Sequence, residues 1–300
     1  MKNIKKLPFI LSILSFLTIF VPANAEIKVV TSIKPIHSLA SYLMDGVAKP
    51  DLIVDGYASP HGFALKPTHA KMLQEADLVF WVGEDLENFL EKPLKSIAKK
   101  AEKIELMEIK GLTKLKFRER NIFDEHGHKE DEHGHKEDEH GHKEDEHGHK
   151  EDEHGHKEDE HGHKEDEHGH DEHAHGEHDP HIWLDPMNAK VILSEMAEHL
   201  IENDSKNEAK YKANLKRAHK DLDQLTKKVK SELNKDFKSI VFHDAYQYFE
   251  KRFDINVLGA FTVNTDVMPG AEQLAEIREV IEHDKVSCVF SEPQFNPDII

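Results

Sequence analysis

Cysteine is almost absent from this chain of 300 residues, which contains Cys288 alone. A single thiol cannot close a disulfide within the chain, so Cys288 is either a small buried hydrophobe or has a partner beyond Ile300. We expect the chain to be truncated at Ile300, because it stops there without a terminal helix or strand. No cysteine stands directly after the N-terminal apolar stretch, which excludes a lipid anchor on a mature N-terminal cysteine.

Long hydrophobic runs are also missing, except near the N-terminus. The stretch from Leu7 to Val21 follows three lysines and is too short for a comfortable membrane span. Small residues at Ala23 and Ala25 then form a cleavage site. We therefore predict that residues 1–25 are a cleaved signal peptide, and that the mature chain is a soluble protein of the periplasm.

Aliphatic side chains are absent between Asp124 and Pro180, apart from Ala174. The seven-residue phrase Asp-Glu-His-Gly-His-Lys-Glu recurs there, and its copies begin at every seventh residue from Asp124 to Asp166, the last copy keeping only its first five residues. A period of seven suggests a coiled coil, but a coiled coil needs apolar positions and this phrase has none. We therefore predict that residues 124–180 are a disordered insert rich in His and acidic residues.

The insert accounts for nearly all of the charge. It holds 24 Asp or Glu and 6 Lys, a net charge of −18 (6 − 24), against −19 for the whole chain. The remainder is nearly neutral, which excludes nucleic-acid binding driven by charge.

The histidines of the insert set it apart from a solubilising acidic linker, for which carboxylates alone would be enough. Imidazole nitrogens among carboxylate oxygens are donors for a divalent metal such as zinc. We predict weak accessory metal collection by His126, His128, His133, His135, His140, His142, His147, His149, His154, His156, His161, His163, His168, His170, His173, His175 and His178.

Short apolar runs alternate with helical patterns on both sides of the insert, which predicts parallel βαβ units. We expect strands at residues 27–33, 51–55, 77–82, 103–109, 239–242, 256–261 and 286–290. A helical pattern over residues 206–233 has apolar residues at three- and four-residue spacing. At 1.5 Å per residue it is about 42 Å long, enough to join two halves of a protein.

The predicted fold class is α/β, with two doubly wound α/β lobes joined by one long helix. We assign residues 26–123 to the first lobe, 181–205 to its remainder, 206–236 to the connecting helix and 237–300 to the second lobe, which looks incomplete.

Three histidines share one predicted setting. His61 and His243 each follow a strand, where open α/β sheets bind ligands in a crevice. His181 lies where the insert rejoins the folded chain. Three neutral imidazoles suit zinc and leave room for a fourth ligand, a carboxylate or water.

Other polar residues receive less specific interpretations. Glu292 also follows a strand, and it either lines the crevice or caps structure. The helical histidines are interpreted as structural, and they are His37, His69, His199, His219 and His283.

Six ordered motifs then match a known family. They span Thr31–Ser38, Ala58–Pro67, Ala76–Gly83, Asp179–Pro186, Phe242–Phe249 and Phe290–Phe295. Over nearly all of the mature chain except the repeats, the sequence resembles the ZnuA family, the periplasmic zinc-binding components of bacterial zinc ABC transporters. The resemblance implies two lobes bridged by a long helix, with zinc held between them by His61, His181 and His243.

This sequence departs from the family pattern in two ways, and the resemblance implies two partners. The family's fourth ligand is an Asp near a later strand, and no matching Asp precedes Ile300; the insert is also longer than expected. Manganese-binding relatives have Glu where this chain has His243, so imidazole there favours zinc. The implied partners are a membrane permease and, through it, an ATPase.

Three functions follow as hypotheses. The leading one is a monomeric carrier, not an enzyme, that captures Zn²⁺ as its transported ligand. A zinc enzyme would also use three histidines with an open position, but no His-Glu-x-x-His helix and no clear general base is present. A periplasmic zinc buffer would act through the repeats alone. Because binding needs neutral imidazole, we expect capture to fade as the pH falls through about 6.5.

Overall fold

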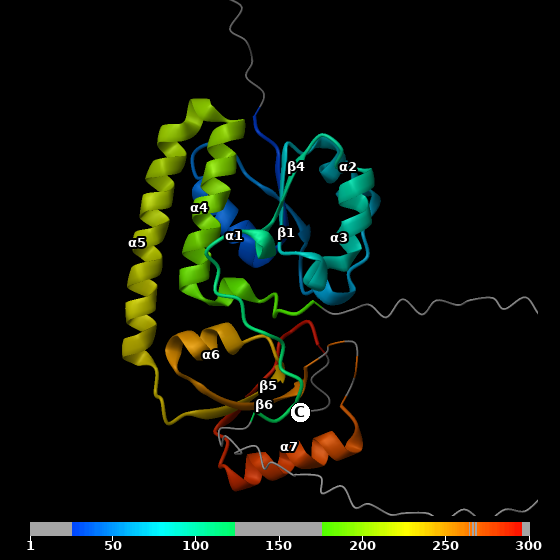
Figure 1. The fold of residues 1–300 in the computed structure, drawn as a ribbon, viewed down its shortest axis with the longest axis vertical. Coiled ribbons are helices and arrows are strands. Elements are labelled where there is room, and N and C mark those ends of the chain that lie inside the picture. Colours follow the sequence, from blue (N-terminus) through cyan, green and yellow to red (C-terminus); the bar gives the residue numbers. More distant parts are fainter. Residues whose placement is uncertain (1–25, 124–175, 264, 266, 268, 296–300) are drawn as a thin grey trace, which may run out of the picture.

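The computed structural model describes residues 26–123, 176–263, 265, 267 and 269–295, which form two α/β lobes stacked along the long axis (Figure 1). The predicted signal peptide, most of the insert and residues 296–300 lie outside this part. Within it, no helix is both long and apolar enough to cross a membrane.

The first lobe is built on a four-stranded parallel sheet with the order β2-β1-β3-β4. The chain runs outward from β1 to β2 and then crosses back to β3, so the sheet is doubly wound. The two central strands, β1 and β3, are buried along their whole length because helices cover both faces of the sheet, whereas the edge strand β4 has only Ile104 buried. The strands are β1 (Val29–Ile33), β2 (Asp51–Val54), β3 (Leu78–Trp81) and β4 (Glu102–Glu105).

Two layers of helix enclose this sheet. On one side lie α2 and α3, and on the other lies α1, covered in turn by the antiparallel pair α4 and α5 (Figure 1). Proline stands in the first turn of α1, α2 and α4, where its missing N–H costs nothing. The helices are α1 (Lys34–Leu43), α2 (Pro67–Glu75), α3 (Glu84–Ser96), α4 (Pro186–Asn203) and α5 (Glu208–Glu232).

The second lobe contains a smaller parallel sheet with the order β6-β5-β7. Its own core is formed by residues such as Ile240, Phe242 and Phe261. Cys288 lies on β7 and is half-buried rather than buried. The elements are β5 (Lys238–His243), α6 (Gln247–Phe253), β6 (Asn256–Thr262), α7 (Ala271–His283) and β7 (Cys288–Phe290).

Helix α5 runs down one side of the first lobe, and the chain then enters the second lobe at β5 (Figure 1). Its 25 residues correspond to about 37 Å at 1.5 Å per residue. The buried face of α5 is narrow and contains Tyr211, Asn214 and Ala218. The Asn214 amide donates to the carbonyls of Leu43 and Asp45, so α5 is fixed to the end of α1.

A second covalent link between the lobes was not expected from the sequence. The segment before the insert, which we assigned to the first lobe, leaves that lobe near Thr113 and packs on the second. Ile122 forms a bridge with Gly259 of β6, and the backbone N–H of Phe123 donates to the Leu258 carbonyl. The reason is local pairing: β6 offers an open edge to this segment.

Polar contacts hold the two lobes against each other. The Arg252 guanidinium of α6 donates twice, at 2.6 Å, to Asp185, the residue that also caps the start of α4. The Tyr248 hydroxyl donates to the Asp179 carbonyl at 2.7 Å and is itself buried. Arg118 is paired with Asp244 and Glu250. These contacts limit how far the lobes can swing apart.

The end of the predicted insert is wrong by a few residues. Residues 176–180 pack on the folded chain, because His178 forms an antiparallel bridge with Lys116 and Asp179 is fully buried. The remainder of the insert, residues 124–175, lies outside the described part.

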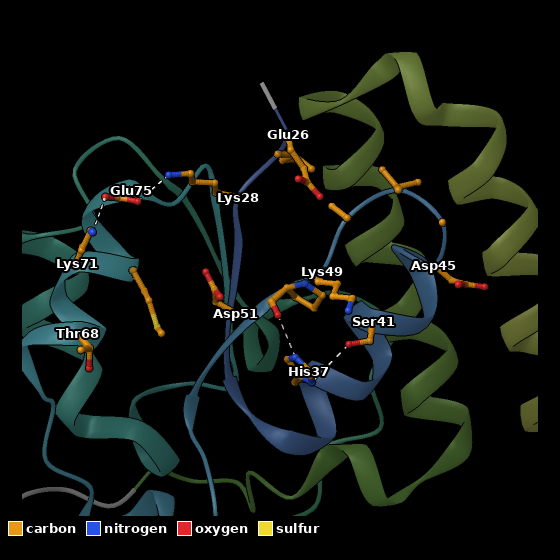
Figure 2. Close-up of a pocket in the computed structure, with 16 residues that line it drawn as sticks. Glu26, Lys28, His37, Ser41, Asp45, Lys49, Asp51, Thr68, Lys71 and Glu75 are labelled. Carbon is orange, nitrogen blue, oxygen red and sulfur yellow. Dashed lines mark hydrogen bonds and ion pairs between the residues drawn. The ribbon is translucent and has the colours of Figure 1, made fainter. Parts of the chain in front are cut away.

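A hollow larger than the one at the predicted crevice lies elsewhere in the first lobe. It lies at the amino ends of β1 and β2, has a volume of about 1260 Å³ and is shown in Figure 2. Three of its charged side chains pair with one another, since Lys28 contacts Glu75 at 2.7 Å and Lys71 contacts the same carboxylate. His37 there bonds the Pro50 carbonyl. Its lining therefore points to no particular ligand.

Candidate metal centre

Three histidine rings meet where the two lobes face each other. The ring centroids of His61 and His181 are 5.7 Å apart, those of His61 and His243 are 5.0 Å apart, and those of His181 and His243 are 5.0 Å apart. One nitrogen from each ring lies within 4.8 Å of the others. Such spacing allows three imidazole nitrogens to reach one cation with small side-chain adjustments.

Each ring is placed by the end of a different element. His61 lies in a short 3-10 turn after β2 (Pro60–Gly62), and the Ser59 hydroxyl accepts its backbone N–H. His243 is the last residue of β5. His181 precedes a 3-10 turn (Ile182–Leu184) that leads into α4. The carboxyl ends of β2 and β5 therefore face one another across the cleft, as expected for open α/β sheets.

The His181 ring is held by a buried carboxylate. Asp179 accepts from both the His181 backbone N–H, at 2.9 Å, and the ring Nδ1–H, at 2.6 Å. This interaction places the ring proton on Nδ1 and leaves the Nε2 lone pair for a cation. The other oxygen of Asp179 is buried without a hydrogen-bond partner. A cation on the far side of the His181 ring would balance the negative charge of Asp179.

Burial keeps two of the rings neutral. Desolvation, followed by the nearby His181, lowers the pKa of His61 from 6.5 to about 4. Burial, with the neighbouring rings, also lowers the pKa of His243 well below its ordinary value. Both rings therefore have free lone pairs at neutral pH, which is the form that binds a metal.

A further carboxylate lines the same cleft. Glu292 follows β7 and shares a hollow of about 390 Å³ with the three histidines and Trp183. Both Glu292 oxygens are buried, with the Tyr246 hydroxyl beside the carboxylate, and burial raises the pKa of this carboxyl. Of the two interpretations left open by the sequence, the cleft-lining one is confirmed.

The remaining predicted site residues separate into two groups. All accessory histidines from His126 to His175 lie outside the described residues. His178 is described; its backbone pairs with Lys116 and it is not part of the three-histidine cluster. His37, His69, His199, His219 and His283 lie on helices as predicted, away from this cluster.

Asp179 is the residue that sequence reasoning missed. By composition it is one more acid at the end of the insert. The signal that was available is its spacing, since a carboxylate two residues before a ligand histidine can accept from that ring.

Comparison with known proteins identifies the family. Residues 29–300 match the ZnuA family, described as "Zinc-uptake complex component A periplasmic". The chain belongs to this family. It is 47% identical over 274 residues to the "High-affinity zinc uptake system protein ZnuA" of Brucella abortus (strain 2308), a match that covers 91% of this chain and 78% of that protein. The protein of the same name from Yersinia pestis is 37% identical over 280 residues, covering 92% and 78%.

Solved structures show the same fold at low sequence identity. A structure titled "Crystal structure of ZnuA" superposes with a TM-score of 0.66 at 20% identity, covering 91% of this chain and 85% of that one. A zinc-bound deletion mutant of a ZnuA superposes with a TM-score of 0.64 at 21% identity, covering 90% and 83%. The predicted α/β architecture of parallel sheets and helices is therefore confirmed.

Proposed function

We propose that this chain captures Zn²⁺ between its two lobes and delivers it to the permease of an ABC transporter for zinc uptake. The observation that carries this proposal is the meeting of His61, His181 and His243 across the interlobe cleft. Zinc prefers four ligands, so three imidazoles leave one position for a carboxylate or water. Membership of a family described as a zinc-uptake component supports the same cargo.

The buried carboxylates suit a divalent cargo. One Asp179 oxygen is unpaired, and the Glu292 carboxylate is buried beside an uncharged group, the Tyr246 hydroxyl. Removing carboxylates from water is costly unless an opposite charge compensates them. A dication beside both groups supplies that charge, and the three uncharged rings alone would not. Glu292 therefore helps to attract and hold the cation in addition to the histidines.

Delivery requires that the cation be released at the membrane. Arg252–Asp185 and the buried Tyr248 hold the lobes closely, and α5 together with the 113–123 segment joins them twice. We infer a small pivot of the lobes, rather than a wide hinge, that opens the cleft when the protein meets the permease and, through it, the ATPase. The working form in the periplasm is a monomer.

The insert is proposed to act as a weak collector of zinc. It rejoins the described chain at Gly176, five residues before His181. Cations held loosely by its many imidazole and carboxylate groups would be concentrated near the mouth of the cleft. This role predicts many weak sites in addition to one tight site.

Zinc titration against a competing chelator tests the proposal on the full chain. His61→Ala, His181→Ala and His243→Ala should each remove the tight site and leave the weak capacity, whereas His283→Ala, an exposed histidine of α7, should change neither. Deleting residues 124–175 should do the reverse and remove only the weak capacity. An undiminished tight site in the His243→Ala chain would contradict the proposal.

Uptake by cells separates the carrier from the two rivals. In cells that depend on this chain for zinc, His243→Ala should abolish growth at low zinc, whereas the repeat deletion should impair growth only mildly. The opposite result would favour a periplasmic zinc buffer acting through the His-rich repeats. Turnover of ester, peptide or phosphate substrates by the zinc-loaded chain, lost in His243→Ala, would favour an enzyme.

A further inference from the structure

A second group of metal-binding side chains lies at the end of the first lobe opposite the cleft. Glu102 is the first residue of β4, and His199 and Glu202 lie near the end of α4. One ligand atom from each of the three lies within 4.8 Å of the others. His199 and Glu202 are three residues apart, so their side chains share one face of the helix.

The His199 ring nitrogen that faces Glu102 lies close to a carboxylate but forms no hydrogen bond with it. His199 Nδ1 lies 2.8 Å from Glu102 Oε1, yet Nδ1 is buried and forms no hydrogen bond. The short distance combined with the poor hydrogen-bond direction means that a proton on Nδ1 would not point at the carboxylate. A nitrogen lone pair so close to a carboxylate oxygen is repelled by it. A cation bound by both atoms removes that repulsion.

The other ring nitrogen faces an acceptor. Glu195, one turn earlier on α4, has its Oε1 3.4 Å from His199 Nε2. Each ring nitrogen therefore has a carboxylate nearby, and a cation bound at Nδ1 would leave the ring proton on Nε2, where Glu195 faces it as in most metal-binding histidines. Asn203 donates to Glu102 Oε2 at 2.8 Å, which leaves Oε1 turned toward His199.

We propose that Glu102, His199 and Glu202 bind a second Zn²⁺, with Glu195 as the residue that positions the His199 ring. Helical periodicity placed His199 among the structural histidines, and the contact with β4 is what distinguishes it. One imidazole with two carboxylates suits zinc and similar divalent metals, whereas magnesium and calcium prefer oxygen ligands alone.

The consequence of this site is local stabilisation. Glu102 and Glu202 are exposed and His199 is half-buried, so solvent competes with the metal and binding is weaker than in the cleft. A cation there joins the start of β4 to the end of α4. Because only the folded chain brings β4 and α4 together, binding stabilises the first lobe in proportion to free zinc.

The test is an amide NMR titration of the full chain at chelator-buffered free zinc, after the cleft site has been filled. We expect saturable shifts at residues 102, 199 and 202. The shifts should be lost in His199→Gln and in the double variant Glu102→Gln, Glu202→Gln, and the apparent affinity should fall about ten-fold in Glu195→Gln. The matched control is Glu198→Gln, which removes the same charge from the same helix and should keep the shifts.

The outcomes are distinct from those of the cleft. His243→Ala removes the cleft site and should leave these shifts unchanged, so the two proposals can fail independently. Unchanged spectra without zinc show that each variant is folded. Equal shifts with Mg²⁺, persistence of the zinc shifts in the double variant, or no saturable shift at residue 199 would overturn the second site.

Discussion

The most informative single perturbation is removal of the carboxylate behind His181. Asp179 is fully buried, and its Oδ1 accepts the His181 ring N–H at 2.6 Å and the backbone N–H at 2.9 Å. Losing a carboxylate that orients a metal-binding histidine costs about 10–100-fold in metal affinity. At about 1.4 kcal/mol per ten-fold, that range is about 1.4–2.8 kcal/mol.

Two substitutions of Asp179 should fall at opposite ends of this range of affinity loss. Asp179→Asn keeps an oxygen that can accept both bonds but removes the charge, so we expect a loss near the lower end, about ten-fold. Asp179→Ala removes both bonds and leaves two buried N–H groups with no acceptor, so we expect about 100-fold. The order wild type, Asn, Ala is itself a prediction, because geometry and charge contribute separately.

Competition with a chelator of known zinc affinity should report on the proposed tight site, because the weak sites proposed for the insert should fill only at higher free zinc. Asp223→Asn is the matched control, since Asp223 is exposed on α5 and contacts only Lys190 among the described ion pairs. Melting curves of the metal-free variants check that folding is retained. If Asp179→Ala binds zinc as tightly as the wild type while remaining folded, the proposed orientation of His181 is refuted.

Three further predictions concern pH, the cleft carboxylate and the junction of the lobes. Fading of zinc capture near pH 6.5, which the sequence alone predicts, should hold for the repeats but not for the cleft, which should retain zinc at pH 5.5 because burial lowers the pKa of His61 from 6.5 to about 4. The same lowering should make the metal-free chain lose up to about 3 kcal/mol of stability as the pH falls from 6.5 toward 4, measurable by melting at each pH. Glu292→Gln should weaken zinc binding several-fold, with a greater effect at low salt, because it removes a negative charge from the cleft. Stopped-flow measurement of zinc loading checks this prediction. Gln294→Ala, on the same loop, is the control. Asp185→Ala should destabilise the chain by at least about 1 kcal/mol, because it removes the cap of α4 as well as the Arg252 pair, and an unchanged midpoint in urea would contradict this.

Most of the secondary structure could be predicted from local sequence pattern, and the main error concerns the end of a strand. The strand predicted at residues 103–109 ends at Glu105, and a 3-10 turn (Leu106–Glu108) follows. Leu106 and Met107 are consecutive and both buried. Only Ile104 of β4 is buried, so the apolar residues that suggested a longer strand belong mainly to the turn that follows this edge strand.

The lengths of α4 and α5, the cap at Asp185 and the parallel character of both sheets follow from periodicity, capping residues and alternation of elements, which are properties of neighbouring residues. The sequence by itself also determined that residues 124–180 contain too few apolar groups for a core, and that three histidines stand at strand or loop ends. These conclusions need only residue types and spacing.

Tertiary structure alone decided which of those residues meet. Strand order, the crossing of residues 113–123 to the second sheet, and the contact of Glu102 with His199 join positions far apart in the chain. The same holds for the 5.0 Å approach of His243 to His61 and His181. Local propensity has no information on such pairs, because they form only when the packing of two cores brings the carboxyl ends of separate sheets face to face.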